Sequence, residues 1–285
     1  MVPEVNKGAF LLPYFKGYYF KHQKDGETVA FIPGISEQGA FIQVLTPGKS
    51  ECFHFTDITF GKTIRIGNNT FSTKGVRISL PCISGCIRYG RLTPLRSDIM
   101  GIFRFFPMEC RHVIISMRHT LSGSLIIHGK KFDYDKGIGY IEGDSGHSFP
   151  KKYIWIQAND LPQEGSLSLS IAAIPFCGFH FRGVIAVLML QGREYRFATY
   201  LGARIMIQNK KILLRQGFYT LTVQLLSRGN GYPLAAPSQG RMSGIVREDN
   251  HACICIRLWE KSRLLCHLTS NHAGYEHFLY NENLS

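Results

Sequence analysis

Apolar and polar side chains alternate along much of this chain with a period of two residues. Ser166–Ile171 alternates at every position, and Lys62–Ile66, Val76–Leu80 and Thr220–Leu225 do the same. This period is typical of strands with one apolar face and one solvated face. No stretch of a dozen residues keeps the apolar spacing of an amphipathic helix. The chain is therefore predicted to be all-β.

Turn residues separate the alternating segments at short intervals. Asp25-Gly26, Gly129, Gln191-Gly192 and Asn230-Gly231 each stand between two predicted strands. Such residues connect hairpins, and hairpins build antiparallel sheets. The spacing predicts about 18–20 strands, which is too many for one flat open sheet. We therefore expect the strands to close into barrels or to stack as a sandwich.

The length of 285 residues allows one large β domain or two ordinary ones. The polar segment Asp133–Gly139 indicates a boundary near residue 135, which would divide the chain into 1–135 and 136–285. The 8 cysteines form no CxxC pair, so we expect buried free thiols in a reducing cytoplasm and no zinc site. No apolar stretch is long enough for a membrane-spanning helix, and the first residues do not resemble a signal peptide.

The chain is basic, with a formal net charge of +13. Its lysines and arginines are scattered singly or in pairs, as at Lys130-Lys131 and Lys210-Lys211. This distribution favours a solvated basic surface over a nucleic-acid-binding surface. Peripheral contact with an anionic membrane surface stays open and would suit a protein that handles membrane-derived molecules.

The densest group of chemically versatile residues lies between Gly139 and Pro150. Tyr140, Glu142 and Asp144 share one face of an extended chain. If that face is dry, repulsion between the two carboxylates keeps a proton on one of them, which makes the pair a candidate general acid. His147 follows a glycine turn and could orient or share that proton. The alternative is that these carboxylates cap backbone amides or pair with basic residues.

Two further strands carry candidate residues. Tyr153, Trp155 and Gln157 share a face, and an aromatic ring beside an amide suits the wall of a pocket for a mainly apolar ligand. In the segment before Arg111 and His112, Glu109 shares a face with Arg111 and Cys110 shares a face with His112. A buried Glu–Arg ion pair is the alternative interpretation of that segment.

The region from Tyr140 to Gln157 resembles the signature of the tocopherol cyclase family. The matching positions are Glu142, Asp144, Gly146, Phe149, Pro150, Tyr153, Trp155 and Gln157. Tyr14–Phe20 is similar to the family's opening segment, Tyr232–Pro237 and Ile256–Glu260 are similar to its closing segments, and Pro107–His112 is similar to the compact bacterial members. Two positions depart from the pattern, because Ser145 and Tyr18 stand where the family has tryptophan.

The resemblance implies a lipocalin-like (calycin-like) two-part β-barrel or sandwich around an apolar cavity. It implies the closure of a chromanol ring on a prenylated quinol, without a metal or a cofactor. An acid protonates an alkene, and the phenol oxygen traps the resulting cation. The residues implied as catalytic are Glu142, Asp144, His147 and His112. The residues implied to bind the substrate are Tyr18, Tyr140, Phe149, Tyr153, Trp155, Gln157 and Arg111.

Two function classes follow from these residues. One class is an enzyme that catalyses ring closure or a related acid-catalysed addition to an isoprenoid alkene. It is favoured by the retained residues Glu142, Asp144, Trp155 and Gln157. The lost tryptophans favour a binding or carrier protein for an isoprenoid, a quinone or a lipid, because an aromatic face stabilises a developing cation. A third class, nucleic-acid binding, depends on the net charge alone, and it would show strongly salt-dependent retention of DNA or RNA.

Overall fold

The structure, a computed structural model, describes residues 14–176 and 179–278. In these residues the chain forms 21 strands and two short 3₁₀ helices, η1 (Gly101–Phe105) and η2 (Thr199–Leu201), and the strands pair antiparallel, as in β1 with β11, β12 with β21 and β20 with β21. The all-β prediction is confirmed. None of the helices in the described residues has the length and apolar character needed to cross a membrane.

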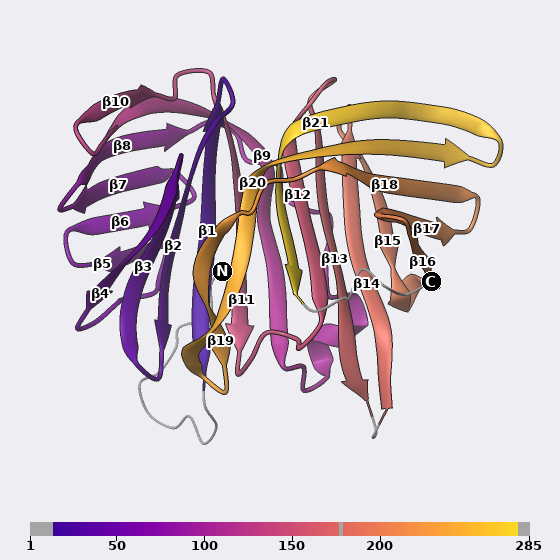
Figure 1. The fold of residues 1–285 in the computed structure, drawn as a ribbon, viewed down its shortest axis with the longest axis horizontal. Coiled ribbons are helices and arrows are strands. Elements are labelled where there is room, and N and C mark those ends of the chain that lie inside the picture. The colour runs from indigo at the N-terminus through magenta and orange to yellow at the C-terminus, as the bar shows by residue number, and fades with distance from the viewer. Residues whose placement is uncertain (1–13, 177–178, 279–285) are drawn as a thin grey trace. The chain divides into compact units, whose positions relative to one another are not determined.

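The first sheet contains eleven strands in the order β4-β3-β2-β1-β11-β9-β8-β7-β6-β5, with β10 paired to β9 (Figure 1). Its outermost strands β4 and β5 are not neighbours in this path, so the sheet is open. The bounds of its strands are β1 Phe15–Lys24, β2 Glu27–Ser36, β3 Gly39–Thr46, β4 Lys49–Phe55, β5 Thr63–Ile66, β6 Asn69–Ser72, β7 Gly75–Leu80, β8 Ile83–Tyr89, β9 Cys110–Ile127, β10 Lys130–Asp133 and β11 Ile138–Gly146.

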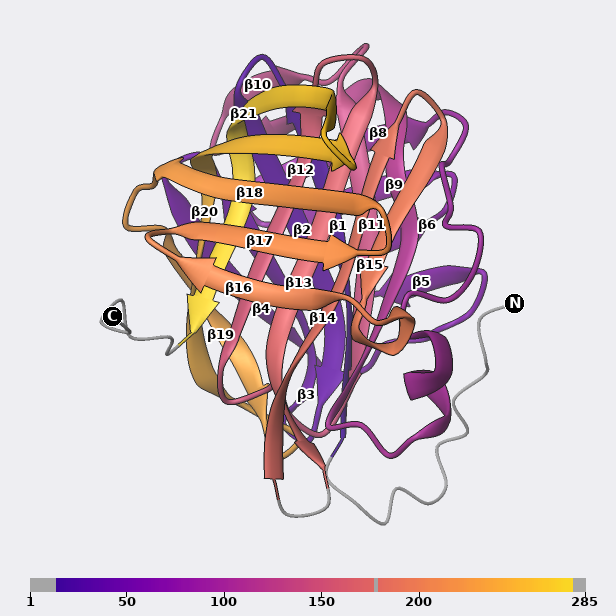
Figure 2. The same ribbon diagram turned by 90° about the vertical axis from the view of Figure 1, so that its right-hand side faces the viewer.

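The second sheet contains ten strands in the order β15-β14-β13-β12-β21-β20-β18-β17-β16, with β19 paired to β20. Figure 2 shows strands β16 to β18 running across β13 and β14, so this sheet folds over on itself as a sandwich. The bounds of its strands are β12 Tyr153–Leu161, β13 Gly165–Phe176, β14 Phe179–Leu190, β15 Arg193–Ala198, β16 Arg204–Gln208, β17 Lys211–Gln216, β18 Tyr219–Ser227, β19 Tyr232–Ser238, β20 Arg241–Glu260 and β21 Arg263–Phe278.

The two sheets have the same topology, except that the second meander has four strands in the first sheet and three in the second. In each, a four-stranded meander (β1–β4 or β12–β15) pairs through its first strand with the last strand of the sheet, β11 or β21. That last strand then pairs with the long strand β9 or β20, and a second meander follows. The sequence shows no matching repeat, because a strand pairing depends on backbone hydrogen bonds and requires only apolar residues on the buried face.

Each sheet encloses an apolar core of its own. In the first, Phe20, Phe31 and Ile141 pack with Phe71 and Ile87 from the other half of the sheet. In the second, a corresponding core contains residues such as Ile156, Leu169, Leu214, Val223 and Ile256. Burial of this much apolar side-chain area is the main stabilising contribution to such a fold.

The chain divides into two compact units that interleave in sequence and do not divide at residue 135. Unit 1 contains residues 1–95, 108–149 and 234–245. Unit 2 contains residues 96–107, 150–233 and 246–285. The strand that carries Glu142 therefore belongs to the unit built from the N-terminal strands. The reason is the pairing of β11 with β1 from Phe15↔Gly146 to Gln23↔Ile138.

Candidate functional site

Strand β11 presents its polar side chains on the face opposite the apolar core of unit 1. Ile141 belongs to that core, and successive side chains along a strand point to opposite faces. Tyr140, Glu142 and Asp144 therefore share the other face, as the sequence predicts. Glu142 is 5% exposed and Tyr140 is fully buried, so the chain holds an ionisable carboxyl group away from bulk water.

Two side chains contact the carboxyl group of Glu142, and a third, Asp144, is joined to it through His112. The Tyr140 hydroxyl donates to Glu142 Oε2 at 2.5 Å. His112 Nε2 lies 3.5 Å from the same oxygen, and His112 Nδ1 lies 2.9 Å from Asp144 Oδ1. His112 comes from β9, where it is directly opposite Asp144 in the register of β9 and β11. The imidazole of His112 therefore bridges the two carboxyl groups.

This arrangement fixes the roles of the two ring nitrogens of His112. We assign the Nδ1 proton to the hydrogen bond with Asp144, because a carboxylate oxygen can only accept. Nε2 then faces Glu142 and can either take a proton from it or return one. The chain Asp144–His112–Glu142 is thus able to hold and transfer one proton in a site that is largely closed to water.

Cys110 also contacts this group but does not serve as a nucleophile. Its thiol donates to Asp144 Oδ1 at 3.4 Å. Burial, together with the nearby Asp144 carboxylate, raises the pKa of the Cys110 thiol well above its ordinary value. The reactive species of cysteine is the thiolate, so Cys110 remains a neutral hydrogen-bond donor at neutral pH.

His112, Glu142 and Asp144 also form the one group in the described residues with enough clustered ligand atoms to hold a metal ion, all within 4.8 Å of one another. The orientation of the ring favours a proton relay over a metal cage. Asp144 contacts Nδ1 and Glu142 contacts Nε2. A metal ion binds one ring nitrogen, so an ion at Nε2 would leave Asp144 as the partner of the other nitrogen and not as a ligand.

Other predicted residues of unit 1 lie elsewhere. Tyr18 is opposite Gly143 on the core-facing side, where its ring lies so close to Gly143 that a Cβ there would be 2.6 Å from Tyr18 Cδ1. Arg111 is exposed and opposite Ser145, on the same side as Tyr18. Tyr19, which the sequence analysis did not select, is directly opposite Glu142 and is 8% exposed.

His147 and Phe149 are placed mainly by contacts with the β19–β20 hairpin and the segment before β9. The backbone N–H of His147 donates to the Glu109 carbonyl at 3.0 Å, and its carbonyl accepts from Gly240 at 2.6 Å. The ring of Phe149 makes an edge-to-face contact with Phe15 at 5.5 Å. These contacts fix the backbone of His147 and the ring of Phe149 at the end of β11.

The remaining predicted residues form a second polar face in unit 2. Tyr153, Trp155 and Gln157 point away from the core side of β12, which contains Ile154 and Ile156. All three are buried. Of the predicted residues, Tyr140, Asp144 and His112 therefore lie around Glu142 in unit 1, and Tyr153, Trp155 and Gln157 share a second face in unit 2.

Two carboxyl groups that the sequence analysis missed lie on this second face. Glu276 is opposite Trp155 on β21, and the Tyr153 hydroxyl donates to its Oε2 at 2.6 Å. Glu248 on β20 is opposite Glu276 and is 1% exposed. No local signal could have found them, because more than 90 residues separate each from Trp155 in the sequence and only the strand register places them side by side.

Comparisons with known proteins agree with this architecture. A sequence model described as tocopherol cyclase-like matches residues 82–277. The structure of CghA with Sch210972 is 8% identical, covers 94% of this chain and 89% of its own, and has a TM-score of 0.61. Kievitone hydratase from Nectria haematococca is 13% identical, covers 98% of this chain and 94% of its own, and has a TM-score of 0.54. At these identities both structures show the fold alone.

Among curated proteins, none matches this sequence significantly. The family match includes β9, β11, β12, β20 and most of β21, which carry both polar faces described above. It covers well over half of the chain, and it agrees with the resemblance of the central residues Glu142 to Gln157. The chain therefore belongs to the tocopherol cyclase-like family.

Proposed function

We propose that this protein is an acid catalyst that closes a ring on a prenylated quinol or a related isoprenoid phenol. The observation that carries the proposal is the buried Glu142 carboxyl group, held between the Tyr140 hydroxyl and the His112–Asp144 pair. Family membership supports a cyclase-like reaction. The identity of the substrate is part of the proposal.

The proposed reaction needs one proton, which the enzyme lends and recovers. Glu142 donates a proton to an alkene carbon of the prenyl chain, and a tertiary carbocation forms at the neighbouring carbon. The phenol oxygen attacks that carbon, forms the C–O bond and loses its own proton. The Glu142 carboxylate or His112 Nε2 accepts that proton, so substrate and product are isomers. Exclusion of water protects the cation and strengthens the electrostatic interactions around it.

The positions of Ser145 and Tyr18, where the family has tryptophan, remove the argument for a carrier. Ser145 and Tyr18 both lie on the face of the sheet opposite Glu142, where Ser145 hydrogen-bonds to Tyr14 and Tyr18 packs beside Phe60. Their replacement therefore does not remove an aromatic ring from the Glu142 face. On that face, Tyr19 and Tyr140 supply aromatic rings next to the acid, and such rings stabilise positive charge.

A turnover assay with prenylated hydroquinones tests the proposal. The expected product is a chromanol with the mass of the substrate, identified by chromatography and mass spectrometry. Glu142→Gln should reduce turnover by roughly 10²–10⁴-fold, which is the usual contribution of a general acid. Asp57→Asn is the matched control, because it neutralises an exposed carboxylate of the same unit and should turn over like the wild type.

The same assay distinguishes the alternatives. Wild-type turnover by Glu142→Gln would refute the acid assignment. A product heavier by one water would mean that water traps the cation, which would keep the acid and exclude ring closure; a fold neighbour named as a hydratase makes this product worth measuring. Retention of the quinol without any turnover by the wild type would overturn catalysis and leave a carrier.

A further inference from the structure

The segment around η1 exposes three large apolar side chains within five residues. Ile102 is 56% exposed, Phe105 is 75% exposed and Phe106 is 49% exposed. The guanidinium of Arg104 lies 4.5 Å from the centre of the Phe105 ring. We refer to Ile102, Arg104, Phe105 and Phe106 as the η1 knob. Large apolar groups clustered on a surface usually mark a binding surface.

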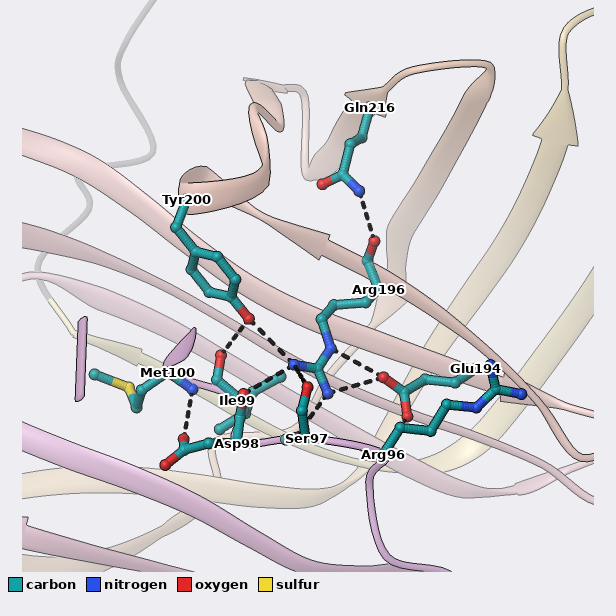
Figure 3. A network of polar contacts seen from close by, with 9 residues as sticks. All are labelled: Arg96, Ser97, Asp98, Ile99, Met100, Glu194, Arg196, Tyr200 and Gln216. Atoms are coloured by element: carbon teal, nitrogen blue, oxygen red, sulfur yellow. Dashed lines mark hydrogen bonds and ion pairs between the residues drawn. The ribbon is translucent and has the colours of Figure 1, made fainter. Parts of the chain in front are cut away.

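The backbone that leads into η1 is fixed by hydrogen bonds to other residues of unit 2. Figure 3 shows that the Arg196 guanidinium donates to the carbonyls of Ser97 and Asp98, both at 2.8 Å, while the Tyr200 hydroxyl donates to the Ile99 carbonyl at 2.9 Å. The side chain of Ile99 is 2% exposed. Hydrogen bonds to backbone carbonyls fix the path of the segment and leave it few alternative conformations.

The packing of η1 separates a partly buried side from an exposed side. Gly101 has φ of +54°, and a Cβ there would lie 2.4 Å from the Tyr200 ring, so only glycine lets the segment approach so closely. Phe103 contacts Tyr200 and Phe181, with ring centres 5.9 and 6.3 Å apart. Phe103 therefore anchors the segment. Among the knob residues, Phe106 also contacts Phe103, with ring centres 6.4 Å apart, and about half of its surface stays exposed, while Phe105 is the most exposed of the three apolar residues.

We propose that the η1 knob docks on an anionic lipid bilayer and inserts Ile102, Phe105 and Phe106 at the level of the headgroups. Aromatic and aliphatic side chains beside a basic residue are the combination that binds this interface. The positive charge of Arg104 and the net charge of +13 complement anionic headgroups. A knob of three apolar residues is also much smaller than the roughly 800 Å² per partner of a stable protein interface.

Docking places the protein at the bilayer, where a prenylated substrate dissolves. Membrane binding by the η1 knob does not itself require the proposed reaction. Turnover of substrate dispersed in detergent should be equal for the wild type and the knob variants. A failure of membrane binding and a failure of catalysis are therefore separate results.

Vesicle sedimentation tests the proposal with the full-length chain. The wild type should bind phosphatidylcholine vesicles that contain phosphatidylglycerol, and it should bind pure phosphatidylcholine vesicles at least several-fold more weakly. Phe105→Ser/Phe106→Ser should weaken binding to the anionic vesicles about tenfold or more, because it removes most of the inserted apolar area. Arg104→Gln should weaken it about fivefold, the loss expected for one basic residue near the surface.

Phe218→Ser is the matched control. Phe218 is 68% exposed, and Lys261 lies over its ring at 4.8 Å, so it is also an exposed aromatic residue beside a cation. The Phe218→Ser variant should bind the anionic vesicles as tightly as the wild type does. Equal binding by Phe105→Ser/Phe106→Ser and the wild type, or no wild-type binding to the anionic vesicles, would overturn the proposal. A wild-type dimer that the double variant converts to a monomer, without vesicle binding, would instead assign the knob to contact between copies.

Discussion

Arg196 should be one of the most important polar residues for the stability of unit 2. Its guanidinium forms an ion pair with Glu194 Oε1 at 2.8 Å and donates to Ser97 Oγ at 2.9 Å, in addition to its bonds to the carbonyls of Ser97 and Asp98 (Figure 3). The side chains of Arg196 and Glu194 are 11% and 7% exposed. Arg196→Met removes every one of these bonds and keeps most of the aliphatic packing of the side chain.

The magnitude follows from what the substitution leaves behind. Glu194 becomes a buried carboxylate without its cation, and breaking a buried pair in this way costs about 3–5 kcal/mol. Two backbone carbonyls also lose a donor, although solvent beside the segment can replace part of that contribution. We therefore expect Arg196→Met to lower the free energy of unfolding by about 4 kcal/mol. Arg196→Met/Glu194→Gln removes the uncompensated charge and should regain about 2 kcal/mol.

Urea unfolding followed by tryptophan fluorescence measures the unfolding free energy of unit 2. Both tryptophans, Trp155 and Trp259, lie in unit 2. Hydrogen exchange of residues 96–107 gives the local opening of the same segment. A loss below about 1 kcal/mol for Arg196→Met would refute the reasoning. So would a double variant less stable than the single one, because the cost would then not arise from the stranded Glu194 charge.

Three further predictions concern unit 1. Gly139→Ala should lower its unfolding free energy by about 2 kcal/mol, because the new Cβ would lie 2.2 Å from His119 Nε2; denaturant unfolding that matches the wild type would contradict this. Burial lowers the pKa of both His22 and His119 to about 3, so between pH 6.5 and 3 the unfolded chain binds protons that the native chain does not. The free energy of unfolding should keep its full value above pH 6.5 and fall as the pH decreases, by about 2 kcal/mol per histidine at pH 5. Equal unfolding free energies at pH 7 and pH 5 would contradict this prediction. Gln43→Ala removes two hydrogen bonds to the backbone of Ala235, at 2.7 and 2.9 Å, and should speed amide exchange at Ala235 at least several-fold.

The strands themselves were readable from the sequence. Ser166–Ile171 lies within β13, Val76–Leu80 within β7 and Thr220–Leu225 within β18. The turns at Asp25-Gly26 and Gln191-Gly192 connect β1 to β2 and β14 to β15 as hairpins. These features could be predicted because the alternation of faces and the preference of glycine for positive φ act within a few residues.

The order of the strands could not be read in the same way. β1 pairs with β11 and β12 pairs with β21, so each sheet joins strands more than 100 residues apart. Any amphipathic strand can pair with any other through its backbone, and the choice among partners depends on how the whole apolar area is buried. For the same reason the repeated topology of the two sheets leaves no trace in the residues.

The candidate site also has one part that the sequence predicts and one part that only the strand pairing determines. The sequence alone placed Tyr140, Glu142 and Asp144 on one face, since three alternate positions of one strand must share a face. Only the register of β9 against β11 brought His112 opposite Asp144, and only the register of β1 placed Tyr19, rather than Tyr18, opposite Glu142. A shift of one residue exchanges the faces of a strand, so the partners of the acid were decided by the tertiary structure.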